Sequence, residues 1–222
     1  MQTQPIIISL EGNIGAGKST IFNKLQQYYS NNPKVVFIKE PVDIWSEIKD
    51  EKNDNILVNY YRDPQKYAFG FQTMVYATQY KLYLDTIKEN PDCKLIISER
   101  SMDAARNVFA KLLKQDNHID EIHFKIYDML YNMNKYNLNY VFYIDVKVDI
   151  CHDRITTRSR DGENEISLDY LTKCNEFYVD WLYNKNDLNE FTSVFSFNGN
   201  ENDNGEKCCL DIIEFLNYTI IF

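Results

Sequence analysis

The sequence predicts an α/β fold in which a central parallel sheet of five strands is flanked by helices. Short apolar runs recur along the chain, and helix-like segments lie between them. Strands that alternate with helices pair in parallel through right-handed crossovers. A glycine-rich loop directly after the first run supports the same fold, because such loops join a buried strand to a helix. The strand-like runs are residues 5–10, 35–40, 95–100, 140–145 and 193–197.

The first run, PIIISL, leads into the loop LEGNIGAGKST, residues 10–20, which matches the pattern G-x-x-x-x-G-K-[S/T]. Glycines let backbone N–H groups converge on a phosphate, and a helix that starts at Lys18 adds the positive end of its dipole. Lys18 supplies a mobile positive charge, and the Ser19 hydroxyl is a hard ligand for Mg²⁺. The alternative is a glycine-rich turn that binds nothing. The predicted phosphate-binding residues are Gly12, Asn13, Ile14, Gly15, Ala16, Gly17, Lys18, Ser19 and Thr20.

The second strand ends in KEPVDIW. Pro41 stops the strand, so Glu40 lies at its carboxyl end, where parallel sheets bind ligands. Trp45 follows within reach of the same opening. The alternative interpretation is a surface glutamate and a packed tryptophan.

A helix that begins near Pro64 places Gln72, Val75 and Gln79 on one face, at i, i+3 and i+7. A glutamine amide offers a donor and an acceptor side by side, which suits the edge of a nucleobase. The aromatic neighbours Tyr67 and Phe69 are interpreted as core residues.

The third strand ends in SERSMDAARNVFA. Glu99 and Arg100 would lie beside the glycine-rich loop if this strand neighbours the first one. Ala105 and Phe109 share a face of the following helix at i and i+4. The alternative is an ion pair together with a core phenylalanine.

Three arginines follow the fourth strand, in the segment CHDRITTRSRDGENE. Arg154 and Arg158 share a helix face, and Arg160 lies just beyond. Like charges at this spacing repel one another unless an anion lies between them, and the alternative is a solvated basic face. Glu163 follows in a glycine-containing turn, where its carboxylate suits sugar hydroxyls better than phosphate.

The fifth strand is followed by a polar loop at residues 198–207 and a last helix. The apolar face expected for this helix is Leu210, Ile213 and either Phe215 or Leu216.

Composition limits the class of protein. A hydrophobic content of 44% over 222 residues suits one globular domain, residues 1–222. A net charge of −9 argues against a nucleic-acid polymer as partner. Five cysteines without a C-x-x-C spacing, and three histidines without a ligand motif, predict a reducing compartment and no structural zinc. No membrane-length apolar run or signal segment is visible, so a cytoplasmic location and no membrane partner are expected.

Five motifs, in this order and at this spacing, resemble the deoxynucleoside kinase family: GNIGAGKST, EPVDIW, YRDP followed by FQ, ERS, and DRITTRSR with the glutamate and YL that follow. The family contains the deoxycytidine, deoxyguanosine and mitochondrial-type thymidine kinases. The resemblance covers residues 5–181. It implies a P-loop kinase fold with an arginine-rich lid, and transfer of the ATP γ-phosphate to the 5′-hydroxyl of a deoxynucleoside.

The resemblance also implies a role for each candidate residue. Lys18 and the loop amides would hold the ATP phosphates, and Ser19 with Glu99 would position Mg²⁺. Glu40 would take the proton from the 5′-hydroxyl, with Glu99 as the rival base, and Arg100 would hold Glu40 in place. The sugar 3′-hydroxyl would contact Tyr61 and Glu163. The base would be read by Gln72 and enclosed by Trp45, Phe71 and Phe109. The lid would be formed by Arg154, Arg158 and Arg160.

Two positions depart from the family pattern. Members that prefer deoxycytidine or purines carry an arginine at the position of Gln79 and an aspartate at that of Ala105. Ala105 resembles the thymidine-accepting and broad-specificity branch, which usually has an apolar residue where Gln79 stands. With Gln72, this pocket is expected to favour thymidine and deoxycytidine over purines, although a polar amide at Gln79 could favour a purine's hydrogen-bonding edge.

Two other functions stay open at this point. A thymidylate-kinase-type nucleoside monophosphate kinase shares the loop and the lid, but Glu40 would repel an acceptor that is already charged. A non-catalytic subunit with a kinase fold would be expected to lack Lys18, Glu40 or the lid arginines. The resemblance further implies a homodimer that pairs through helices within residues 76–87 and 122–133, although both helices could equally cover the sheet.

Overall fold

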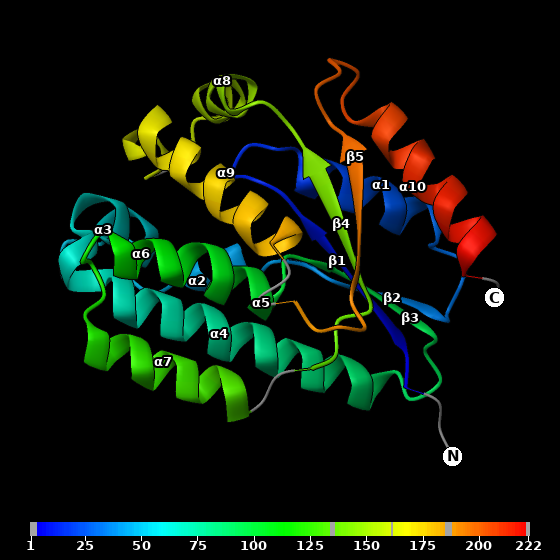
Figure 1. Cartoon of the computed structure of the whole chain (residues 1–222), viewed down its shortest axis with the longest axis horizontal. Helices are drawn as coiled ribbons and strands as arrows, with labels where there is room; N and C mark the ends of the chain where they lie inside the picture. The colour runs from blue at the N-terminus through cyan, green and yellow to red at the C-terminus, as the bar shows by residue number, and fades with distance from the viewer. Residues whose placement is uncertain (1–3, 134–135, 161, 185–187, 221–222) are drawn as a thin grey trace.

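The computed structural model describes residues 4–133, 136–160, 162–184 and 188–220, and it confirms the predicted α/β class. Its five strands form one parallel sheet in the order β2-β3-β1-β4-β5 (Figure 1). Each predicted strand is present, with ends that differ from the prediction by at most two residues. The strands are β1 (Ile6–Glu11), β2 (Val35–Ile38), β3 (Leu95–Glu99), β4 (Tyr140–Asp145) and β5 (Ser193–Asn198).

The central position of β1 brings two predicted motifs together. Strands β3 and β4 pair with β1 on either side, and the register places Leu10 opposite Glu99. The loop after β1 and the residues after β3 therefore meet at the carboxyl edge of the sheet, which is the edge that binds ligands in such folds.

Helices bury both faces of the sheet (Figure 1). Helices α1 (Lys18–Tyr28) and α10 (Glu206–Thr219) cover one face, where they pack against Ile8 and Leu10. On the other face, helix α9 (Leu168–Tyr183) and residues 104–112 pack against Ile7. Burial on both faces explains why the strands are continuously apolar rather than alternating.

The remaining helices surround the carboxyl edge and the flank of the domain. Side-chain caps start several of them: Asn55 accepts from the N–H of Val58, and Asp63 accepts from that of Lys66. These helices are α2 (Val42–Ser46), α3 (Ile56–Arg62), α4 (Pro64–Glu89), α5 (Met102–Ala104), α6 (Lys111–Gln115), α7 (Glu121–Met133) and α8 (Val148–Arg158). A π-helix at Ala105–Ala110 and a 3₁₀ turn at Glu163–Glu165 complete the list.

Two local predictions are corrected by the structure. Ala105 and Phe109 lie in a π-helix, a wide turn that often occurs at functional sites, rather than in an α-helix. On α10, Ile213 and Leu216 are buried as expected, but Leu210 is 56% exposed. The buried face is completed by Cys208, Cys209 and Ile212. The cysteines act as small apolar residues and belong to the buried face of α10, and Leu210 lies outside that face.

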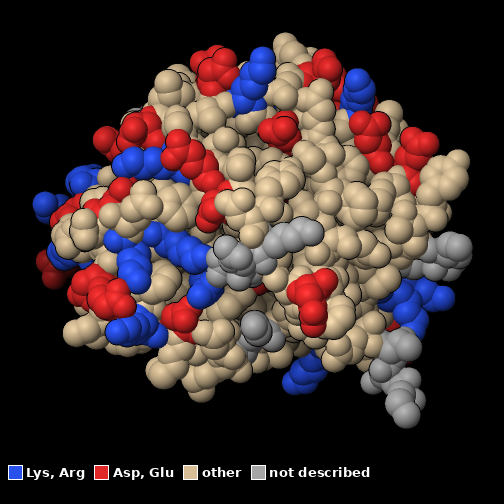
Figure 2. Space-filling model, in the orientation of Figure 1, with Lys and Arg blue, Asp and Glu red and all other residues tan. Residues whose placement is uncertain are grey.

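Neither the surface charges nor the cysteines of the described residues indicate a further candidate site. On the face seen in Figure 2, Lys and Arg side chains are interspersed with Asp and Glu rather than gathered into one patch. All five cysteines are buried as free thiols, and no group of three or more potential metal-ligating residues occurs in the described ranges. Within those ranges, no helix combines the length and apolar character needed to cross a bilayer.

Candidate active site

The glycine-rich loop folds around its own lysine. The Lys18 ammonium donates hydrogen bonds to the carbonyl oxygens of Gly12 at 2.9 Å and Asn13 at 2.8 Å. Burial, and after it the charge of Arg100, lowers the pKa of Lys18 to about 8, although nearby carboxylates oppose both effects. The ammonium is therefore held at the mouth of the loop, where phosphate oxygens can replace the two carbonyls.

The glycines of the loop are required by both packing and backbone conformation. Gly15 has φ +82°, and a Cβ there would lie 2.4 Å from the carbonyl oxygen of Cys151. Gly17 has φ +89° and precedes α1, whose first turn has no side-chain cap. The first N–H groups of α1 are consequently open to an anion.

The other loop residues hold its shape. The Asn13 amide donates to the carbonyl oxygen of Leu171 in α9 at 2.8 Å, and its oxygen accepts the N–H of Ile14 at 2.9 Å. Ala16 is buried in the core. The loop is thus fastened to α9 and to the sheet, which fixes the direction of its N–H groups.

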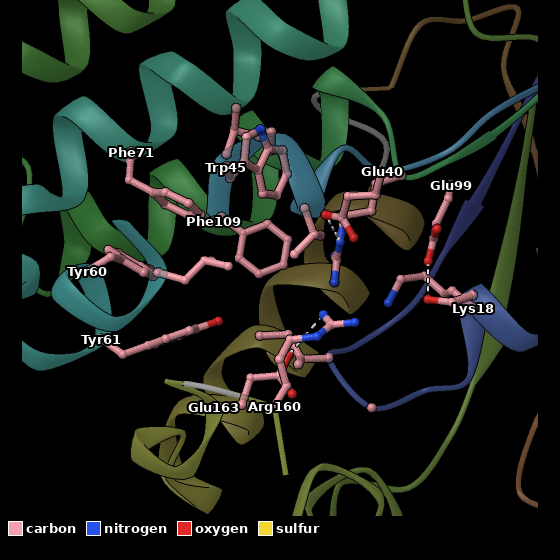
Figure 3. Close-up of a pocket in the computed structure, with 18 of the residues that line it drawn as sticks. Lys18, Glu40, Trp45, Tyr60, Tyr61, Phe71, Glu99, Phe109, Arg160 and Glu163 are labelled. Carbon is pink, nitrogen blue, oxygen red and sulfur yellow. Dashed lines mark hydrogen bonds and ion pairs between the residues drawn. The ribbon is translucent and has the colours of Figure 1, made fainter. Parts of the chain in front are cut away.

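Two carboxylates and two partners gather where β2 and β3 end (Figure 3). The Ser19 hydroxyl donates to Glu99, and the Arg100 Nε lies 2.9 Å from the Glu40 carboxylate. Arg100 has φ +65°, a left-handed conformation that is unusual for a residue with a side chain and costs about 1–3 kcal/mol. This conformation turns Arg100 away from the strand and into the site.

Sequence analysis missed the residues that hold Arg100. Its Nη1 donates to the Tyr178 hydroxyl at 2.7 Å, and Tyr178 donates to the Glu11 carboxylate at 3.2 Å. Ser101 also donates to Glu11, at 2.7 Å. Burial raises the pKa of Glu11, against the opposing effects of its hydrogen bonds and of Arg100. The signal in the sequence was a carboxylate at the end of a buried strand, directly before Gly12.

A cavity extends from the loop to α4. Figure 3 shows aromatic side chains at one end and Lys18, Glu99 and Glu40 at the other. Every residue predicted to bind the substrate lines this cavity: Glu40, Trp45, Tyr61, Phe71, Gln72, Gln79, Arg100, Ala105, Phe109 and Glu163. Sequence analysis did not identify four further lining residues: Val42, Leu57, Tyr60 and Tyr170.

Aromatic rings form the wall of the apolar end. Phe71 stacks on Tyr60 with ring centroids 4.5 Å apart, and Trp45 meets Phe71 edge-on at 5.8 Å. Phe109 lies under the Arg100 guanidinium, 4.7 Å from ring centroid to Cζ. These flat surfaces suit a planar heterocycle. Tyr67 and Phe69 are half-buried at the margin of the adjoining core cluster, consistent with a packing role.

Two amides on α4 face this end of the cavity. Gln72 and Gln79 are almost fully buried, at 3% and 8% exposure. The Oε1 of Gln72 and both amide atoms of Gln79 make no hydrogen bond to any described residue. A buried polar group without a partner costs about 1–3 kcal/mol, so these atoms are suited to a ligand.

Two of the three predicted lid arginines share one anion, which is the chain's own Glu163. Arg158 binds this buried carboxylate through Nε at 3.0 Å and through Nη2 at 2.7 Å, and Arg160 lies 3.3 Å from it. Tyr61 lines the cavity nearby, and burial holds the pKa of its hydroxyl well above the usual range. Tyr61 is therefore a hydrogen-bond donor at neutral pH.

Arg154 is separated from the other two arginines. Its Nη2 donates to the carbonyl oxygens of Gly199 at 3.1 Å and Glu201 at 3.2 Å. It lines a second cavity between the glycine-rich loop and residues 199–205. Gly15 and Arg158 line both cavities, so the two cavities adjoin at the loop.

The chain is similar to several known proteins. Residues 8–220 match the family model described as "Deoxynucleoside kinase". The fowlpox virus protein named "Probable deoxycytidine kinase" is 31% identical over 196 residues, which cover 86% of this chain and 78% of the viral protein. Human deoxycytidine kinase is 28% identical over 80% of this chain and 75% of its own length. The mitochondrial deoxyguanosine kinase of Xenopus laevis is 27% identical over 80% of this chain and 73% of its own length.

Proposed function

The chain belongs to the deoxynucleoside kinase family, and we propose that it transfers the γ-phosphoryl group of ATP to the 5′-hydroxyl of a deoxynucleoside. The observation that carries this proposal is the continuity of one cavity, from flat aromatic walls and free amides to Lys18, Glu40 and Arg100. A base bound at the aromatic end would direct its sugar toward the charged end. The reaction is the entry step of nucleotide salvage.

Phosphoryl transfer depends on alignment and charge neutralisation more than on covalent chemistry. We assign to Glu40 the acceptance of the 5′-hydroxyl proton, because its carboxylate lines the cavity in a salt bridge with Arg100, whose guanidinium lies over the Phe109 ring. Lys18 and the free N–H groups of α1 would bind the β- and γ-phosphates. Tyr61 and Glu163 would bind the sugar 3′-hydroxyl.

Ser19 and Glu99 fit a Mg²⁺ ion. Their hydroxyl and carboxylate oxygens are adjacent at the mouth of the loop, and Mg²⁺ is usually held by one or two such oxygens together with substrate phosphates and water. The ion would neutralise charge on the phosphates. Because Glu99 faces Ser19 rather than the aromatic end, we propose it as a metal-sphere residue and Glu40 as the base.

Replacing Glu99 by glutamine should raise the Mg²⁺ concentration needed for half-maximal activity by roughly tenfold, since an amide is a weaker ligand than a carboxylate. A Mg²⁺ titration at saturating ATP measures this. Glu40→Gln is the matched control and should leave the midpoint unchanged. An unaltered midpoint in Glu99→Gln would remove Glu99 from the metal sphere.

The proposed function is tested by ATP turnover with the four natural deoxynucleosides and with thymidine monophosphate. Phosphorylation of nucleosides but not of the monophosphate supports the proposal. Preference for the monophosphate would assign a thymidylate-kinase-type activity, and turnover of none would leave a non-catalytic subunit. The Glu40 carboxylate favours the uncharged acceptor, because it would repel a bound monophosphate.

Pyrimidines are proposed as accepted substrates. Ala105 is buried in the cavity wall and leaves room for the 5-methyl group of thymine. Gln72 can pair with thymine or, after an amide flip, with cytosine. Thymidine and deoxycytidine would bind through Ala105 and Gln72, and neither base pairs with both atoms of the Gln79 amide.

We also propose a homodimer. Helix α7 exposes an apolar stripe at i, i+4, i+7 and i+11, and it lies beside α4 (Figure 1). The stripe is Ile122, Ile126, Met129 and Met133. Leu84 on α4 is also exposed, whereas Tyr80 and Ile87 pack against core clusters. A second copy fits this stripe because the resemblance to the family implies pairing through these helices.

Light scattering at micromolar concentration should therefore give a dimer mass, and Met129→Glu should give a monomer, since it places a charge in the apolar contact. Leu210→Glu is the control, because Leu210 is 56% exposed like Met129 but lies on α10. A monomer mass for the unmodified protein, or dissociation by both substitutions, would contradict this interface.

A further inference from the structure

Gln79 is a polar residue of the cavity to which the proposed phosphoryl transfer assigns no role. Its side chain is 92% buried, and neither amide atom has a partner among the described residues. It lies two helical turns from Gln72, about 10 Å along the axis of α4. Because both residues line the same cavity, their amides address two different parts of one bound base.

The four bases can be compared by what they offer to two such amides. Adenine presents an acceptor at N1, two N–H donors on its 6-amino group and an acceptor at N7. Gln72 can donate to N1 and accept one amino proton, and Gln79 can accept the other proton and donate to N7. This second contact is the bidentate pairing by which glutamine recognises adenine in the major groove of DNA.

The other bases leave part of the Gln79 amide unpaired. Thymine offers its O4 lone pair to the Gln79 NH₂ but sets a methyl group against the carbonyl. Cytosine gives an amino proton to the carbonyl but sets a C–H against the NH₂. Guanine has acceptors at both O6 and N7, so the Gln79 carbonyl faces no donor. Each of these complexes retains a buried polar group without a partner.

We infer that Gln79 reads the N6–N7 edge of adenine and makes deoxyadenosine the preferred acceptor. The inference rests on the proposed function. It also reverses the substrate preference that Ala105 alone suggests. Room for a methyl group admits a pyrimidine, but a pyrimidine leaves part of the Gln79 amide without a hydrogen bond. Trp45 and Phe71 form flat walls beside Gln72 and Gln79, and a purine ring can stack on such walls as a pyrimidine can.

The test compares kcat/KM for five acceptors: deoxyadenosine, 7-deaza-2′-deoxyadenosine, deoxyguanosine, deoxycytidine and thymidine. In the unmodified protein, deoxyadenosine should exceed each other natural nucleoside by about tenfold or more, and replacement of N7 by C–H should cost about tenfold. In Gln79→Met, which keeps the length of the side chain, the penalty for 7-deaza substitution should disappear and thymidine should gain relative to deoxyadenosine.

The possible outcomes separate this inference from the proposed function. No 7-deaza penalty in the unmodified protein would overturn the assignment of Gln79, and this result does not depend on any variant folding. A Gln79→Met variant that loses the same factor with every nucleoside would indicate a merely structural role and overturn it as well. Phosphorylation of no nucleoside at all would instead refute the proposed function.

Discussion

Glu40→Gln should lower kcat by roughly 10² or more while the KM for the nucleoside stays within a few-fold. Glutamine has the shape of glutamate and can still accept a hydrogen bond from Arg100, 2.9 Å away in the native protein. It cannot accept the 5′-hydroxyl proton as the bond to phosphorus forms. Steady-state kinetics at saturating Mg·ATP, together with nucleoside binding by calorimetry, measure the two effects separately.

The outcome decides between two carboxylates that the sequence could not distinguish. Turnover within a few-fold of the native value in Glu40→Gln would move the role of the base to Glu99. Loss of nucleoside binding in step with turnover would mean that Glu40 positions the substrate and does not act on the proton.

Replacing both Arg158 and Arg160 by alanine should lower kcat by roughly 10³ and change nucleoside affinity little. Arginines that approach a transferring phosphoryl group act on charge that develops in the transition state, and comparable arginines contribute 10³ or more. In the present structure both arginines bind Glu163. We expect that a bound phosphate competes for them and leaves Glu163 free for the sugar hydroxyl. Pre-steady-state turnover and nucleoside titration provide the measurement.

Arg154→Ala is the matched control, because Arg154 lies on α8 with Arg158 but contacts the carbonyls of Gly199 and Glu201. It should raise the KM for ATP more than it lowers kcat. The lid assignment would be wrong if the double variant Arg158→Ala, Arg160→Ala lost nucleoside affinity at unchanged kcat. It would also be wrong if Arg154→Ala gave the same changes as the double variant.

Local sequence patterns were sufficient to predict the strands and the glycine-rich loop. A continuous apolar run is readable because both faces of each strand are buried, and the loop pattern is readable because glycines, lysine and serine have separate steric or chemical tasks. The prediction was wrong at two places where residue spacing alone does not reveal the local structure. Leu210 is exposed because Cys208, Cys209 and Ile212 complete the buried face of α10, and the widened turn at Ala105–Ala110 leaves no trace in residue spacing.

The sequence by itself determined the fold class, the family resemblance and the substrate-binding candidates that line the cavity, because these depend on residue type and spacing along the chain. Only the tertiary structure decided how those residues pair. Glu11 and Tyr178 are separated by 167 positions and reach Arg100 only because β1, β3 and α9 meet at one edge of the sheet. The same packing gives Arg158 and Arg160 a carboxylate, turns Arg154 to another loop and leaves the Gln79 amide without a partner. Hydrogen bonds and ion pairs require contact within a few ångströms, and contacts between distant segments are fixed by packing rather than by sequence spacing.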